Sequence, residues 1–84
     1  MNQLVKNDSI KGMATITKHD TELVDTRYSQ GLMVTGAGNV NIEFIDNTTA
    51  IIAFAAGDIL KCDFIRIKAT STTATGIAGL RLKI

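Results

Sequence analysis

The sequence predicts an all-β fold, a small single-domain β-sandwich or barrel that is jelly-roll-like and has six to seven short antiparallel strands. Three observations support this prediction. Proline is absent, whereas threonine and the other β-branched residues that favour strands recur along all 84 residues. Several short segments alternate apolar and polar residues, as half-buried strands do. Turn-forming residues separate these segments at the roughly 8–12-residue spacing typical of sandwiches and barrels.

The length of the chain limits the stability of its own core. A domain of this size buries roughly 60–65% of its unfolded surface, and small domains usually compensate with disulfides, metals or oligomerisation. A single cysteine, Cys62, excludes an internal disulfide, and a single histidine, His19, argues against a zinc site within one chain. We therefore expect no cofactor and no metal, and we expect the chain to associate with itself as a trimer or pentamer.

The first elements are weakly patterned. Residues 1–12 have no sustained period and are expected to form an N-terminal arm, followed by a single β domain over residues 13–84. Within this domain, a first strand is expected over residues 13–17 and a polar turn over residues 18–21. Another short extended piece is expected to begin at Leu23-Val24.

The central part of the chain predicts a strand over residues 31–35 and a hairpin over residues 40–54. Residues 40–44 alternate cleanly, and residues 46–48 predict a turn because Asx side chains hydrogen-bond their own backbone and tolerate left-handed conformations. The Gly-Ala-Gly sequence at residues 36–38 is interpreted as a tight hairpin turn. It does not match a dinucleotide-binding loop, because a strand and not a helix follows it.

Two segments leave alternatives open. The seven apolar residues Ala50–Ala56 fit a strand buried on both faces, or a short helix that ends at Gly57; the neighbouring strands favour the strand. After residue 59 the apolar phase changes near Phe64, so either a bulge lies there or both faces of the strand are covered.

The last strand is expected to carry Leu80, Leu82 and Ile84 on its inward face. A Thr- and Ser-rich turn is expected to make this strand the antiparallel neighbour of the preceding one. Basic residues alternate along both strands and would then form one stripe, either a solvated face or a surface that contacts acidic residues of a neighbouring subunit. The candidate interface residues are the basic ones together with apolar residues of the preceding strands: Ile51, Phe54, Phe64, Arg66, Lys68, Arg81 and Lys83.

Three tracts, taken in order, resemble the small spike-base proteins on the heads of tailed phages and phage-like gene-transfer particles. They are Ile16–Thr21, Arg27–Val40 and Gly57–Leu80, and the resemblance covers about residues 14–82. The chain departs from that family in having no proline beside Gly57. The resemblance implies a structural virion protein, a capsid-surface decoration or head-spike base that forms a symmetric homo-oligomer. Its implied partners are the major capsid protein or another virion structural protein, and a fibre protein.

Two other kinds of function remain open from sequence. One is a ligand- or carbohydrate-binding β-sandwich module, although sugar platforms usually need exposed aromatics and this chain has no Trp and a single Tyr, Tyr28. The other is a structural component of a tail or baseplate. Both share the predicted fold, so the pattern of strands does not separate them from a capsid protein.

The sequence gives no sign of catalysis. His19 and Asp20 are adjacent, so on a strand they would point to opposite faces, and a solvated turn histidine is the simpler interpretation. Cys62 has no local histidine and is interpreted as a buried packing thiol. We therefore expect a protein that is not an enzyme.

Charge and hydropathy set the remaining expectations. A net charge of +1 gives no reason to expect nucleic-acid binding, and no stretch reaches the roughly 20 apolar residues of a membrane span. The first residues lack the basic region and apolar core of a signal peptide. We expect synthesis in the host cytoplasm and a final location on the capsid surface of the virion.

Overall fold

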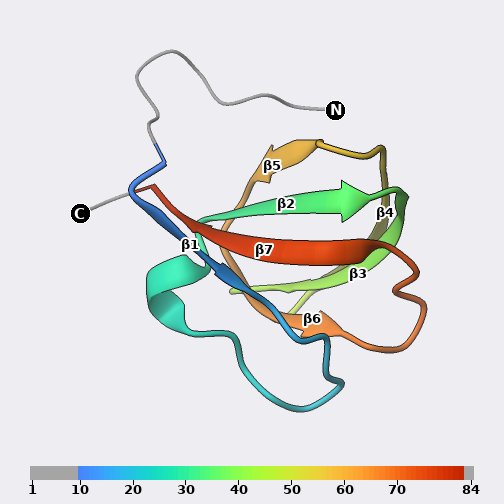
Figure 1. Ribbon diagram of the computed structural model, residues 1–84. Helices are drawn as coiled ribbons and strands as arrows, with labels where there is room; N and C mark the ends of the chain where they lie inside the picture. Colours follow the sequence, from blue (N-terminus) through green and yellow to red (C-terminus); the bar gives the residue numbers. More distant parts are fainter. Residues whose placement is uncertain (1–9, 83–84) are drawn as a thin grey trace.

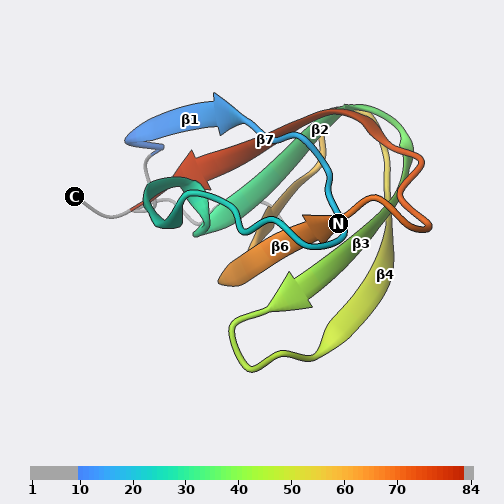
Figure 2. The ribbon, with the colours of Figure 1, turned by 90° about the horizontal axis from the view of Figure 1, so that it is seen from below.

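The computed structural model describes residues 10–82, which form seven strands in two antiparallel sheets and one short 3₁₀ helix (Figure 1). The first sheet has the strand order β1-β7-β2-β5, and the second has the order β4-β3-β6. Figure 2 shows the two layers facing each other. The all-β, sandwich-type prediction is confirmed. The elements are β1 (Gly12–Thr15), η1 (Thr26–Tyr28), β2 (Gly31–Gly36), β3 (Gly38–Phe44), β4 (Thr49–Phe54), β5 (Ile59–Lys61), β6 (Phe64–Lys68) and β7 (Thr75–Arg81).

Parts of the sequence-based prediction concern residues 1–9, Lys83 and Ile84, which lie outside the described residues. Most of the predicted N-terminal arm is therefore not placed. The extended piece predicted at Leu23-Val24 is not a strand, because these residues belong to the long connection between β1 and β2.

The chain passes from one sheet to the other at Gly36–Gly38, so the predicted hairpin turn at this position is wrong. β2 belongs to the first sheet and β3 to the second. A Cβ added to Gly36 would lie 1.9 Å from Thr75 Oγ1, and one added to Gly38, whose φ is +155°, would lie 2.5 Å from the backbone nitrogen of Ala74. Glycine is needed here because the corner passes directly against the connection between β6 and β7.

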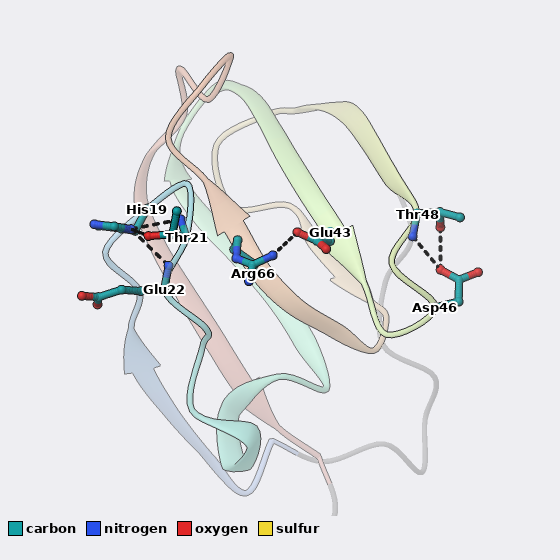
Figure 3. A network of polar contacts seen from close by, with 7 residues as sticks. All are labelled: His19, Thr21, Glu22, Glu43, Asp46, Thr48 and Arg66. Atoms are coloured by element: carbon teal, nitrogen blue, oxygen red, sulfur yellow. Dashed lines mark hydrogen bonds and ion pairs between the residues drawn. The ribbon is translucent and has the colours of Figure 1, made fainter.

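The predicted hairpin of β3 and β4 is confirmed, including its turn. Asn47 has a left-handed φ of +70°, and Asp46 Oδ1 accepts hydrogen bonds from the Thr48 backbone N–H at 3.0 Å and from its hydroxyl at 2.6 Å (Figure 3). β4 is a strand, so the helical alternative is wrong. Its burial on both faces is also wrong, because Ile51 is 55% exposed while Ile52 packs against the core.

Both a crossing between sheets and a bulge explain the change of phase near Phe64. β5 pairs with β2, but β6 pairs with β3 in the other sheet. The register of β3 and β6 shifts by one residue between Glu43 and Phe44, which leaves Ile65 as the extra residue of a bulge near Phe64, as predicted. Phe64 and Ile67, three residues apart, are consequently both buried, each 1% exposed.

The predicted pairing of the last two strands is wrong. β6 and β7 lie in different sheets, and β7 pairs instead with β1 and β2. Ile77 belongs to the core between the sheets, and Leu80, three residues later in a regular register, lies on the opposite face of the sheet above Gly31. Leu80 is fully buried and Leu82 half-buried, but neither faces the core as predicted.

The core is built from both sheets, because one alternating face of each strand points into the space between them. Its buried members are Leu32, Val34, Val40, Ile42, Phe54, Phe64, Ile67, Ala74 and Ile77.

We expect Gly38→Ala to destabilise the protein much more than Gly57→Ala. At Gly38 a methyl group meets backbone atoms that cannot move aside, which adds an overpacking cost of about 1–3 kcal/mol to the backbone strain. Gly57 also has a positive φ, +85°, but nothing lies within 4 Å of its Cβ position, so strain of about 1–2 kcal/mol acts alone. Urea unfolding measures both; equal losses would contradict the close contact at the corner.

Candidate functional site

The outer face of the three-stranded sheet brings together three of the predicted interface residues. Ile51 of β4 lies opposite Asn41 of β3, and Asn41 lies opposite Lys68 of β6. In the next row, Glu43 lies opposite Arg66. This outer surface of β3, β4 and β6, called the polar face below, exists because the alternate residues of β3 are apolar and face the core.

An ion pair occupies the middle of the polar face. Arg66 Nη1 donates to Glu43 Oε1 across β6 and β3 (Figure 3), and the two side chains are only 19% and 12% exposed. Arg66 Nε is buried and has no hydrogen-bond partner. The charge of Arg66 is therefore compensated within the chain, which makes it a weaker candidate for contacting an acidic partner than the sequence suggested.

The structure separates the other predicted interface residues. Phe54 and Phe64 are 4% and 1% exposed and pack in the core, so they offer no surface to a partner. Arg81 lies on β7 in the other sheet, and Lys83 lies outside the described residues. The single basic stripe on neighbouring strands does not form, because β6 and β7 do not pair.

Residues 18–25, called the strap below, run along the outer edge of β6. The backbone N–H of His19 donates to the carbonyl of Ile67, and that of Val24 donates to the carbonyl of Ile65, both at 2.8 Å. The strap thus covers an edge that would otherwise present unpaired backbone groups. Sequence reasoning missed it because the segment has no apolar period.

The polar side chains of the strap hold its own turn. His19 Nδ1 accepts hydrogen bonds from the backbone N–H groups of Thr21 and Glu22, each at 3.1 Å (Figure 3). The carboxylate of Asp20 accepts from the Thr70 backbone N–H and hydroxyl, each at 3.0 Å. Asp20 is thus bound to Thr70 and does not orient His19, which is an exposed turn histidine as predicted.

Cys62 is half-buried against the core, and burial raises the pKa of its thiol to about 11, with a smaller contribution from the charge of Asp63. Its thiolate is therefore scarce near neutral pH, in keeping with a packing role. Across residues 10–82, no group of three or more His, Cys, Asp or Glu side chains is placed to hold a metal ion. Within the same residues, no helix has the length and apolar character to cross a membrane.

Two small cavities lie near β1. The larger, about 260 Å³, borders the start of β7, and the other, about 190 Å³, lies between β1 and the strap. Both are smaller than the roughly 300–1,000 Å³ of typical small-molecule sites. Tyr28 is the aromatic residue that lines the smaller cavity. Its full lining is Ala14, Thr15, Ile16, Thr17, Glu22, Leu23, Val24, Asp25 and Tyr28.

No family model and no curated protein matches the chain. Among solved structures, the chain is similar to one from a structure described as "Capsid of native GTA particle computed with C5 symmetry". The two share 28% sequence identity with a TM-score of 0.79, and the match covers 93% of this chain and 92% of the other. The neighbour is thus a capsid component, and the similarity in fold and sequence extends over nearly the whole of both chains.

Breaking the ion pair of the polar face should cost stability. Glu43→Ala leaves the guanidinium of Arg66 poorly compensated, and we expect a loss of about 1–3 kcal/mol in the free energy of unfolding. The double variant Glu43→Ala with Arg66→Met should recover part of this loss. The control is the pair of Arg27 and Asp25, whose side chains are 68% and 47% exposed, where Asp25→Ala should have a much smaller effect. Additive losses at Glu43 and Arg66 would contradict their coupling.

Acid should weaken the attachment of the strap. The Arg27 side chain lowers the pKa of Asp25 from 3.8 to about 2, and hydrogen bonds from Thr70 lower the pKa of Asp20. A lowered pKa means that the stabilising contribution is complete above about pH 4 and is lost as the pH falls through the folded-state value. Carboxyl chemical shifts measured by NMR should titrate below 3.8 for both residues. In the Asp20→Asn variant, the chemical shift of the Thr70 amide should no longer change with acid. If that change persists, a group other than Asp20 causes it.

Proposed function

We propose that the chain is a structural virion protein, built in many copies into the capsid of a phage-like or gene-transfer particle. The observation that carries this proposal is the match to a chain of the GTA capsid over 93% of this sequence, in both fold and residues. The resemblance of the three sequence tracts to spike-base proteins supports the same class of function.

The finer role that we propose is a decoration or head-spike base on the capsid surface, made in the host cytoplasm. The chain would dock on the major capsid protein or another virion structural protein, and would in turn hold a fibre protein. Docking is assigned to the β6 side of the polar face, where Lys68 lies beside Asn41. Its mechanism is burial of surface and pairing of strands, without catalysis.

Self-association is part of this proposal. Five large apolar side chains among the described residues are more than 40% exposed, namely Ile10, Met13, Leu23, Ile45 and Ile51. Burial of these side chains between copies would remove apolar surface from water, which favours association. The sequence predicts three or five copies.

The alternatives gain less support. A carbohydrate-binding module would need an aromatic platform, but Phe54 and Phe64 are buried in the core and Phe44 packs against it. Tyr28 stacks with Arg27, whose guanidinium lies 5.5 Å from the ring centre. A role in the tail or baseplate would use the same surfaces and differs only in location on the particle.

Purified particles test the proposal. We expect the chain to co-purify with complete heads in many copies, and particles assembled without it to keep their shell but lose density on its outer surface in cryo-electron microscopy. Lys68→Glu should reduce incorporation several-fold without a change in thermal melting, whereas Lys11→Glu, at an exposed lysine outside the polar face, should not. Recovery of the chain only with tails, or only in the soluble fraction, would contradict the proposal.

A further inference from the structure

The edges of the two sheets are not equally protected. β1 and β5 end the first sheet, and β4 and β6 end the second. The strap covers β6, and β5 is only three residues long. β1 and β4 contain no charged residue, and within residues 10–82 no other segment pairs with their outer edges. Uncharged open edges of this kind readily accept another strand.

The hydrogen bonding of the β3–β4 hairpin shows which groups of β4 are available. The Phe44 N–H donates to the Thr48 carbonyl at 2.8 Å, which fixes the alternation of paired residues along the hairpin. Every second residue of β4 then directs its N–H and C=O groups away from β3. These residues are Thr49, Ile51 and Ala53, and Ile51 is 55% exposed.

The same reasoning applies to β1. The Ile16 N–H donates to the Ile77 carbonyl at 2.9 Å, in register with the pairing of β1 and β7. Met13 and Thr15 therefore direct their backbone groups away from β7, and Met13 is 49% exposed.

We propose that β4 of one copy adds to β1 of the next copy, and that this head-to-tail contact closes a ring. The inference rests on the proposed function, in which many copies assemble on one shell. β1 and β4 lie on opposite sides of the molecule (Figures 1 and 2), as a contact between two different surfaces requires. Each copy supplies one β1 and one β4, so a closed ring leaves neither edge open. Pairing of β4 with β4 of a second copy would leave every β1 edge uncovered.

A cavity beside β1 could receive a side chain of the β4 strand that comes from the neighbouring copy. The space of about 190 Å³ between β1 and the strap is lined by Ala14, Ile16, Leu23 and Val24, and Leu23 is 65% exposed. The exposed Ile51 of the neighbouring β4 would bury its side chain against these apolar residues. Each such contact is small, and closure of the ring strengthens it because every copy is then held on two sides.

Disulfide trapping tests the identity of the two strands. In a Cys62→Ser background, Met13→Cys and Ile51→Cys are made as separate proteins, with Asp63→Cys, exposed between β5 and β6, as the control. We expect oxidation of the mixed Met13→Cys and Ile51→Cys proteins to give a covalent dimer, and each protein alone to remain uncrosslinked. A chain carrying both cysteines should give a ladder that ends at three or five copies. Crosslinking of Ile51→Cys with itself, or a yield in the mixture no higher than with Asp63→Cys, would overturn the proposal.

A lysine placed on the outer edge of β4 tests the ring independently, through the native mass of the protein. Ile51→Lys should shift the native mass from the ring to the monomer with an unchanged melting temperature, whereas Ile45→Lys, at a 64% exposed position in the β3–β4 turn, should keep the ring. A native mass that stays monomeric for the unsubstituted protein, while the protein still enters particles, would overturn the ring and the proposed self-association, and would leave the proposed role as a structural virion protein standing. Rings that form but never enter particles would support the ring and overturn the proposed role in the virion.

Discussion

The arrangement of the two sheets depends on the contact between the glycine corner at Gly36–Gly38 and the connection from β6 to β7. The backbone N–H groups of Thr73 and Ala74 both donate to the carbonyl of Asn39, at 2.8 and 3.1 Å. The hydroxyl of the buried Thr72 donates to the Lys68 carbonyl and accepts from the Asn41 N–H. Two separate crossings between the sheets are therefore fixed against each other at one place.

The function proposed for the chain depends on this contact. Because it sets where β3 begins and where β6 ends, it determines the register that places Asn41 between Ile51 and Lys68 on the polar face. It also leaves β4 at the far edge of its sheet, where no strand of the described residues covers it. The surfaces assigned to docking and to self-association are consequences of how the chain crosses between layers.

Local features of the fold are predictable from the sequence, whereas the assignment of strands to sheets is not. Alternation located the β3–β4 hairpin, and Asp46-Asn47 predicted its turn, because both signals depend on near neighbours. The glycines at positions 36 and 38 are compatible with a hairpin turn or with a crossing between the two sheets. The contact with Ala74, which is distant in the sequence, distinguishes the two. The change of phase near Phe64 correctly indicated a bulge, but it gave no sign that β5 and β6 lie in different sheets. The predicted basic stripe does not form because β6 and β7 also lie in different sheets, which the alternation along each strand does not reveal.

The unequal protection of the edges connects the fold to assembly. The strap uses several polar interactions, those of His19 and Asp20 among them, to cover β6, so one edge of the three-stranded sheet is closed within the monomer. β4, at the other edge of the same sheet, is longer and uncharged, a combination that would favour uncontrolled pairing in a free protein. In the ring that we propose, this edge would pair with β1 of the next copy, and within one copy β1 lies on the opposite side of the molecule. Among residues 10–82, the strap closes β6 while the outer edges of β1 and β4 remain unpaired, which is the surface expected of a ring-forming subunit.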